Sequence, residues 1–258
     1  MEKLQNKISQ KISLVSIVIP VYNERKTIET IVGRVQKVEI PKELIIVDDG
    51  STDGTREWLY ERFGQVSSDG ERSQNVFRES RADGSRVRVL THQHNQGKGE
   101  ALKTGFLNAR GGIVIVQDAD LEYNPEDYHR LLEPVITGRA DVVYGSRFLG
   151  AWKGNWPLVS FLGNKIFTVL TNAATGLSLT DVWTGYKVFK HEVLKDISLE
   201  ESGFELELEL TLKVAQKKWR VTEVPISYLP RSKAEGKKIG WRDGIQSIKT
   251  LYRYSHTS

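Results

Sequence analysis

The sequence predicts an α/β protein with a Rossmann-like, mainly parallel sheet that carries helices on both faces. Two observations support this prediction. Short runs rich in Val and Ile alternate, through the first half, with longer segments whose apolar residues recur three and four positions apart, the spacing of one helix face. The short runs are apolar at consecutive positions, which is typical of strands buried on both sides in parallel sheets.

Each strand of the first half is predicted from such an apolar run. The predicted strands are residues 14–20, 43–49, 87–92, 112–117 and 140–145. The predicted helices between and after them are residues 23–38, 51–63 (a turn followed by a helix), 98–110 and 125–136. We expect Asn23 to be the N-cap of the first helix and Pro125 to lie in the first turn of the last. The polar segment 64–86 is expected to be a surface insertion, and no function is assigned to it.

The second half loses the regular alternation of strands and helices. Apolar periodicity predicts helices over residues 158–176 and 203–218, the second of them amphipathic, and a strand over residues 220–229. Residues 231–241 have the composition of a loop. Residues 241–254 are predicted to form a helix whose apolar side faces either a membrane surface or the domain itself.

Composition excludes several classes of protein. The chain has 258 residues, a net charge of +4 and no cysteine, which excludes disulfides and thiolate metal sites and is compatible with a reducing compartment. No apolar run approaches the roughly 20 residues that span a bilayer, and the amino terminus lacks a signal-peptide core. We therefore expect a cytoplasmic protein that makes at most peripheral contact with a membrane.

The charge is unevenly distributed along the chain. From Lys217 to the end there are ten Lys or Arg residues and three Asp or Glu residues, and residues 142–180 contain no carboxylate. Both features favour an anionic partner such as a phosphate or a lipid surface, although a solvated basic face explains the charge as well. We do not expect a nucleic-acid partner, because no recognised binding motif accompanies the basic tail.

Acidic or polar clusters follow three of the predicted strands. Tyr22 to Glu24 follow the first strand, Asp48 and Asp49 end the second, and Asp118 and Asp120 follow the fourth. The carboxyl ends of parallel strands meet at one edge of a sheet, where ligands bind in such folds. We therefore expect these side chains to form one site.

The pair Asp118 and Asp120 has the spacing of an oxygen-ligand site for a metal. Two carboxylates one residue apart repel each other at the end of a buried strand, and a divalent cation bound between them removes that repulsion. Mg²⁺ and Mn²⁺ suit carboxylate ligands, and Mg²⁺ commonly also takes phosphate oxygens of a substrate. The sequence therefore predicts a Mg²⁺ or Mn²⁺ site, although an Asp-X-Asp string by itself more often marks a turn.

Five segments resemble, in order and spacing, family-2 glycosyltransferases with the GT-A fold: IVIPVYNE, LIIVDDGSTDGT, NQGKGEALKTGF, QDADLEYNPED and YGSRF. Three later segments resemble the branch that makes dolichyl- or polyprenyl-phosphate sugars: GNKIFTVLTNAATGLSLTDVWTGYKVF, FELELELTLKVAQ and VPISYLPRSKAEGKKIGWRDG. The resemblance covers residues 14–254. It implies a single GT-A catalytic domain over residues 1–258, with a nucleotide-sugar-binding half at 14–150 and an acceptor-side half at 151–258.

The resemblance implies roles for residues at the first two strand ends. Pro20, Tyr22 and Glu24 match the family's nucleotide-facing first loop, and Val47 and Asp49 match its contacts to the base and the ribose. A carboxylate suits such contacts because it accepts hydrogen bonds from ring N–H and hydroxyl groups. The alternative for Asp49 is a turn cap within the turn-forming segment DDGSTDG.

The third cluster matches the family's metal segment. Asp118, Ala119 and Asp120 match the residues that bind the metal and the sugar nucleotide, and Glu122 falls where the family often has Gln or another oxygen donor to the metal. Lys98, between two glycines at a helix start, resembles an anion-binding turn. The alternative for Lys98 is a solvated helix terminus.

Basic residues and one carboxylate complete the implied site. Arg147, Arg231 and Lys237 match basic positions that the family places around phosphates, and the 231–241 loop is expected to close over a bound donor. Gly236 stands where the family usually has Ser, so the register of this loop is open. Asp181 is the candidate general base; the alternatives are that it orients the acceptor pocket, which we favour, or caps a turn.

The resemblance implies inverting, metal-dependent transfer of a hexose from UDP-glucose or GDP-mannose to a polyprenyl or dolichyl phosphate. The first alternative is the same chemistry on a saccharide or small-molecule hydroxyl, because the additional Arg that relatives carry near the start of the acceptor helix is absent. Two explanations stay open: Lys165 substitutes for that Arg, or the acceptor differs. A sugar nucleotidyltransferase is disfavoured because PVYNERKT replaces the expected glycine-rich loop. A binding protein that has lost catalysis would conserve the fold but has no need of the acidic pair.

Overall fold

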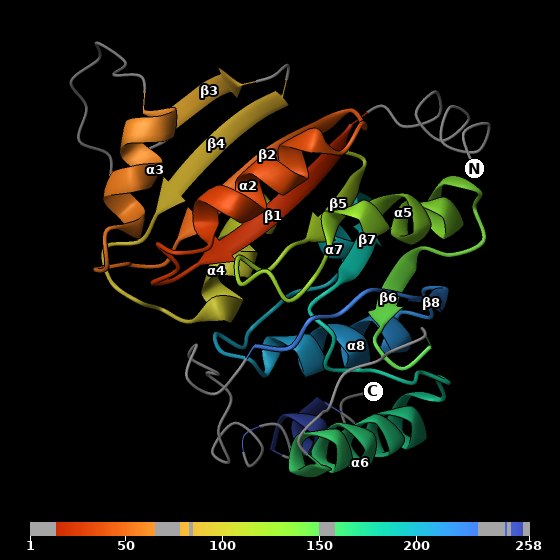
Figure 1. Cartoon of the computed structure of the whole chain (residues 1–258). Coiled ribbons are helices and arrows are strands. Elements are labelled where there is room, and N and C mark those ends of the chain that lie inside the picture. Colours follow the sequence, from red (N-terminus) through yellow and green to blue (C-terminus); the bar gives the residue numbers. More distant parts are fainter. Residues whose placement is uncertain are drawn as a thin grey trace.

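The computed structural model describes residues 14–64, 78–82, 85–149, 158–231, 246 and 249–254 (Figure 1). In this part of the chain one eight-stranded sheet has the order β3-β4-β2-β1-β5-β7-β6-β8. The strands are β1 (Val15–Val21), β2 (Lys42–Asp48), β3 (Arg78–Ala82), β4 (Ser85–Thr91), β5 (Ile113–Val116), β6 (Val142–Ser146), β7 (Lys187–Lys190) and β8 (Val221–Pro225). Strands from both halves of the sequence therefore share one sheet.

The sheet is mainly parallel, which confirms the prediction. β1 pairs in parallel with β2 and β5, β2 with β4, and β6 with β8. β3 and β7 run antiparallel to their neighbours. β7 was not predicted from the sequence, because its four residues, KVFK, include only two apolar ones and are too few to show a period.

Helices cover both faces of the sheet, as predicted. The first face carries α2 (Ile28–Lys37), α3 (Thr55–Phe63) and α5 (Tyr128–Ile136). The second face carries α4 (Lys98–Leu107), α7 (His191–Asp196) and α8 (Leu206–Gln216). Successive strand residues contribute to the two cores in turn: Ile17 and Ile19 to the first, Val18 to the second. This two-sided burial is the reason why the strands are apolar at consecutive positions.

α8 is buried on all sides over its first two turns, so the prediction of an amphipathic helix is wrong. Every residue from Leu206 to Leu212 is buried, including Glu207 and Glu209. The sheet lies on one side of α8, and α6 (Leu158–Thr175) packs on the other (Figure 1). The two glutamates are therefore inside the protein and need charged or hydrogen-bonding partners there.

α6 forms an outer layer next to α8. Phe167 on its inner side stacks on Trp183, with ring centroids 4.4 Å apart. Four of its apolar residues are exposed, at helical spacing: Leu162, Ile166, Val169 and Leu170. Across the ranges given above, no helix has both the length and the apolar character that crossing a membrane requires.

One local prediction is wrong. Asn23 does not cap α2, since Thr27 holds the N-cap position, and Asn23 instead has a φ of 54° and accepts a hydrogen bond from the Thr52 backbone N–H. Asn tolerates the left-handed region because its short side chain can hydrogen-bond locally. The segment 64–86 contains β3, which forms an antiparallel edge pair with β4, and residues 65–77, 83 and 84 lie outside the described residues. Pro125 does lie in a first turn, that of the 3-10 helix η1 (Pro125–Asp127) ahead of α5.

Candidate active site at the carboxyl edge of the sheet

The ends of β1 and β2 bring the predicted nucleotide-facing residues together. Pro20 and Val47 are register partners in the parallel pair and both are buried. Tyr22 and Glu24 follow at half-buried positions, and the Glu24 backbone N–H donates to Thr55 Oγ1 at 3.0 Å. This hydrogen bond ties the first loop to the start of α3, and so holds Glu24 at the carboxyl edge.

Asp49 is buried and holds the turn that leads into α4. Its Oδ1 accepts from the Gln96 N–H and its Oδ2 from the Gly97 N–H, both at 2.9 Å, and only 2% of the residue is exposed. Asp48 accepts from Arg56 Nε at 2.6 Å. Asp49 therefore stabilises the turn before α4 and not its own segment DDGSTDG, where Asp48 Oδ1 accepts from the Ser51 N–H at 3.2 Å. A contact of Asp49 to base or ribose stays a prediction.

His92 also lies inside this network. Its Nδ1 is 2.7 Å from Asp49 Oδ1, its Nε2 is 3.0 Å from Thr104 Oγ1, and 6% of the residue is exposed. His92 is buried because α4 packs over the end of β4. Its position directly after an apolar strand was the available signal for burial.

The loop after β5 presents the predicted metal pair. Ala119 packs in the core with 4% exposure, and Asp118 and Asp120 on either side of it are half-buried. Burial raises the pKa of Asp120 to about 7, with further contributions from the negative charges of Asp118 and Glu122. No Lys or Arg of the described ranges makes an ion pair with Asp120. A divalent cation would supply the missing positive charge, so this carboxylate pair fits Mg²⁺ or Mn²⁺.

Glu122 has a different environment from the one expected. Its Oε2 accepts from the Tyr228 hydroxyl at 2.8 Å and its Oε1 from the Arg231 N–H at 2.9 Å. Within the described part of the chain, no group of three His, Asp or Glu side chains is arranged to hold a metal ion. The protein ligands for a cation here would therefore be Asp118 and Asp120, with further oxygens from a substrate, and metal binding by Glu122 stays a prediction.

Lys98 is the positive partner of Asp118. Its Nζ lies 2.8 Å from Asp118 Oδ1 and 3.2 Å from Glu207 Oε1. Glu207 in turn pairs with Lys187, whose Nζ is 2.5 Å from Glu207 Oε2 and wholly buried. Burial alone would lower the pKa of Lys98, but the carboxylates of Asp118 and Glu207 raise it above its ordinary value. Lys98 is therefore a half-buried, ion-paired cation rather than a solvated helix terminus.

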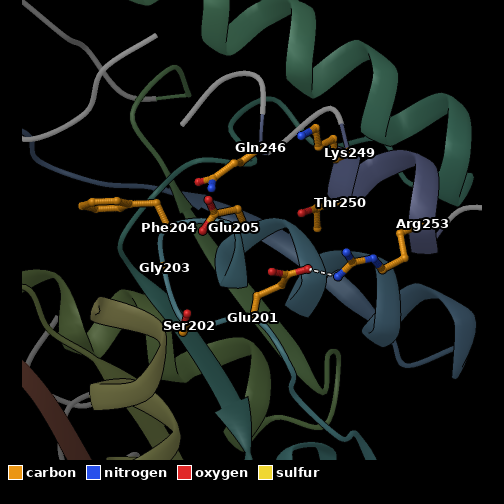
Figure 2. Close-up of a pocket in the computed structure, with 9 residues that line it drawn as sticks. All are labelled: Glu201, Ser202, Gly203, Phe204, Glu205, Gln246, Lys249, Thr250 and Arg253. Carbon is orange, nitrogen blue, oxygen red and sulfur yellow. Dashed lines mark hydrogen bonds and ion pairs between the residues drawn. The ribbon is translucent and has the colours of Figure 1, made fainter. Parts of the chain in front are cut away.

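A polar pocket of about 310 Å³ lies behind the loop that supports Lys98 (Figure 2). It is enclosed by residues 201–205 on one side and by the C-terminal helical residues on the other, and Arg253 pairs with Glu201 across it at 2.9 Å. Phe204 leaves the same loop toward α4, with its ring centroid 6.0 Å from Lys98 Nζ. The loop thus connects this pocket with the Lys98 turn.

Arg231 closes the site on the side of β1. Its Nη2 is 2.9 Å from Glu24 Oε2, and its Nε donates to the backbone carbonyl of Asp120 at 2.6 Å. The bridge between Tyr123 and Tyr228 holds the segment after β8 beside the loop after β5. Arg231 therefore faces the predicted metal segment, whereas Lys237 lies outside the described residues.

Arg147 and Asp181 form a buried bidentate ion pair. Nε and Nη2 of Arg147 are each 2.7 Å from an oxygen of Asp181, and the Asn164 amide donates to Asp181 Oδ1 at 2.9 Å. Asp181 is 0% exposed. Burial alone would raise the pKa of Asp181, but Arg147 and Asn164 outweigh it and hold the pKa below its usual range. A carboxylate so engaged is suited to orient Arg147 and is a poor proton acceptor.

Sequence reasoning missed four residues of this site. Glu207 pairs with Lys98, and Lys187 pairs with Glu207. Tyr228 donates to Glu122, and Gly185 packs so closely on Asp118 that a Cβ there would collide with the carboxylate. The signal for Glu207 was present, since Glu205, Glu207 and Glu209 alternate with Leu, and a two-residue spacing places Glu207 on the opposite side of a helix from the other two. Lys187 and Gly185 carried no comparable signal, because their importance depends on contacts far away in the sequence.

Known proteins resemble this chain over most of its length. The Glycosyl transferase family 2 model matches residues 16–198. The polyprenol monophosphomannose synthase of Mycolicibacterium smegmatis is 31% identical over 231 residues, covering 87% of this chain and 80% of that protein. The undecaprenyl-phosphate mannosyltransferase of Micrococcus luteus is 31% identical over 234 residues, covering 86% of each.

Solved structures share the architecture. Glucosyl-3-phosphoglycerate synthase from Mycobacterium tuberculosis, in complex with Mn²⁺, UDP and phosphoglyceric acid, superposes with a TM-score of 0.71 at 19% identity, covering 98% of this chain and 83% of that chain. The same enzyme with Mg²⁺ and UDP gives a TM-score of 0.69. At this identity the likeness establishes the GT-A fold. Together with the match to residues 16–198, it shows that the chain is an enzyme of glycosyl transferase family 2.

Proposed function

We propose that this enzyme transfers a hexose, with inversion, from a nucleoside diphosphate sugar to a polyprenyl phosphate in a reaction that depends on Mg²⁺ or Mn²⁺. The observation that carries the proposal is the carboxylate pair Asp118 and Asp120, half-buried at the carboxyl edge with Lys98 and Arg231 on its two sides. The two carboxylates would bind a metal ion, and the basic groups beside them would bind the phosphates of a diphosphate attached to that metal.

The donor side follows from these charges. Asp118 and Asp120 would hold the cation, which would neutralise the diphosphate and stabilise the charge on the departing nucleoside diphosphate. Arg231, fixed by Glu24 and the Asp120 carbonyl, adds positive charge at the rim. Pro20, Val47 and the loop at Tyr22 would form the wall for the nucleoside.

The acceptor side requires no general base. A phosphate monoester is already an anion near neutral pH, so its oxygen attacks the anomeric carbon as the bond from that carbon to the diphosphate breaks. Arg147 is the residue that we assign to the acceptor phosphate, and Asp181 orients it through two 2.7 Å contacts. The ring of Tyr228, 5.1 Å from the Arg147 guanidinium, restricts it further.

The exposed face of α6 supports a lipid acceptor. Leu162, Ile166, Val169 and Leu170 are 56%, 51%, 65% and 43% exposed. The helix contains no acidic residue, and the surrounding segment 142–180 contains none either. An apolar face without negative charge suits a bilayer that carries anionic headgroups. We assign this α6 face to the membrane surface from which a polyprenyl phosphate would be taken.

Donor turnover tests the proposed reaction. The purified protein is incubated with Mn²⁺ or Mg²⁺, a short-chain polyprenyl phosphate, and either UDP-glucose or GDP-mannose. We expect metal-dependent release of UDP or GDP together with a glycolipid, loss of both with EDTA, and no activity in Asp120→Ala. Glu192→Ala, at a side chain that is 61% exposed and distant from the site, is the control and should act like wild type. Donor cleavage that needs a hydroxyl compound instead of the lipid phosphate would overturn the acceptor assignment.

Vesicle binding tests the α6 face. Leu162→Glu combined with Val169→Glu should lower sedimentation with vesicles containing anionic lipid, because two carboxylates then face the headgroups. Leu107→Glu is the matched control, since Leu107 is an 87% exposed leucine on α4. Equal sedimentation of both variants and wild type would contradict the assignment of this face.

A further inference from the structure

We propose that Lys98 is a movable internal counter-ion: it neutralises Asp118 while the site is empty, and its ammonium shifts to Glu207 when the donor arrives with its cation. Binding of the cation is thereby coupled to binding of the nucleotide. This inference rests on the proposed function. It adds a role for Lys98, Glu207 and Lys187 that the transfer reaction by itself does not require.

The ammonium of Lys98 already reaches both carboxylates. Its Nζ is 2.8 Å from Asp118 Oδ1 and 3.2 Å from Glu207 Oε1. A lysine ammonium has three donors on a flexible stem, so a small rotation strengthens one contact at the expense of the other. No movement of the backbone is needed for the shift.

Glu207 is prepared to receive that ammonium. Its Oε1 is buried and carries no hydrogen bond, although Lys98 stands at ion-pair distance. Its Oε2 is held by Lys187, at 2.5 Å. Lys187 is itself fixed by the Thr184 carbonyl at 2.5 Å and is 0% exposed, so Glu207 cannot turn away. The structure thus keeps one acceptor of Glu207 available beside Lys98.

The charges alternate along this chain of contacts. Asp118, Lys98, Glu207 and Lys187 carry negative, positive, negative and positive charges, so these four residues together have no net charge. A dication bound to Asp118 would lie close to the Lys98 ammonium, and the two positive charges would repel each other. Glu207 offers the ammonium a second partner, and an arriving diphosphate offers a third. The cation should therefore bind weakly to the protein alone and tightly together with the nucleotide.

Titration with Mn²⁺, followed by the electron paramagnetic resonance signal of the free ion, tests this coupling without any turnover. The titration is run without nucleotide, with UDP and with GDP. Lys98→Met removes the competing charge, so we expect its nucleotide-free Mn²⁺ affinity to rise about tenfold and the enhancement by nucleotide to fall by a similar factor, within the usual range of coupling between sites. The control is Lys103→Met. Lys103 lies on the same helix, has the same side-chain exposure of 18% and pairs with Glu100, so this variant should bind Mn²⁺ like wild type.

Glu207→Gln gives an independent result. Without the Glu207 charge the ammonium stays on Asp118, so the nucleotide-free Mn²⁺ affinity should fall several-fold. In the Lys98→Met background the same substitution should change that affinity by less than about twofold, because no ammonium remains to be placed. A merely structural role of Glu207 would lower the affinity equally in both backgrounds. Lys98→Met decides the question alone if Glu207→Gln does not fold, since Lys98 is at the rim of the buried network.

Two outcomes overturn the inference in distinguishable ways. If the wild type binds Mn²⁺ with nucleotide, but Lys98→Met leaves the nucleotide-free affinity unchanged or weaker, Lys98 is not a counter-ion and the proposed function stands. If the wild type binds no Mn²⁺ with UDP or with GDP, the metal-dependent reaction and this inference both fail.

Discussion

Replacing Asp181 with Asn tests whether this carboxylate accepts a proton or holds Arg147 in place. Both oxygens of Asp181 are already engaged, by the Arg147 guanidinium at 2.7 Å and by the Asn164 amide at 2.9 Å. Asn has the same shape but no charge. The substitution therefore removes the counter-charge of a buried guanidinium while disturbing the packing little.

The expected loss of stability follows from that burial. Arg147 is 7% exposed and Asp181 is 0% exposed, and removing one partner of such an ion pair costs about 3–5 kcal/mol. For a chain of this size each kcal/mol lowers Tm by about 2–4 °C, so Asp181→Asn should melt on the order of 10 °C below wild type. Asp196→Asn is the control, because Asp196 and its partner Lys217 are 40% and 51% exposed and such pairs are worth below about 1 kcal/mol.

Thermal unfolding and turnover are measured on the same preparations, at a temperature where each variant is folded. With a polyprenyl phosphate acceptor we expect Asp181→Asn to retain measurable turnover, with a raised KM for the acceptor, because Arg147 is less well oriented. The KM for the donor should stay near the wild-type value. The acid limb of the pH profile should also be unchanged, because Asp181 does not exchange a proton during the reaction.

The opposite pattern would refute the reasoning. If Asp181→Asn unfolds at the wild-type temperature, binds donor normally and shows no turnover, then the carboxylate takes a proton from the acceptor. The acceptor would in that case be a hydroxyl compound, and the ion pair with Arg147 would have to open during catalysis.

Two further predictions concern packing at the site and pH. Gly185→Ala pushes a methyl group against the Asp118 carboxylate, so Mn²⁺ affinity with nucleotide should fall about 10–100-fold. The control is Gly33→Ala, where nothing lies within 4 Å of the added methyl group, and it should bind Mn²⁺ like wild type. If Gly185→Ala binds Mn²⁺ as tightly as wild type, the site accommodates the methyl group and the prediction is wrong. Hydrogen bonds from Arg220 outweigh the effect of burial and hold the pKa of Asp141 well below its usual range. The ionised Asp141 side chain therefore stabilises the folded protein fully above the pKa that Asp has in the unfolded chain, about 4. This stabilisation is lost as the pH falls from there toward the pKa in the folded protein. Denaturant unfolding should then show a steeper acid loss of stability for wild type than for Asp141→Asn, and parallel curves would contradict this.

The local pattern of apolar and polar residues was sufficient to predict most strands of the sheet and the position of the candidate site. Apolar runs identified β1, β2 and β5 within one or two residues, because a strand buried on both faces needs apolar side chains at every position. The polar residues that stop these runs identified the carboxyl edge. β7 was missed, because its place between β5 and β6 depends on pairing with strands from elsewhere in the chain.

The sequence by itself determined the fold class, the edge of the sheet that carries the candidate site, and the acidic pair Asp118 and Asp120, because each depends on residues that are neighbours in the chain. Only the tertiary structure decided which charges meet. Arg147 and Asp181 are 34 residues apart, and Lys98 joins Asp118 to a glutamate of α8. Periodicity reports which face of an element is buried, but not what lies opposite that face. The partners of a buried charge are set by the packing of distant elements, and in this protein the roles that we propose for the candidate site rest on those partners.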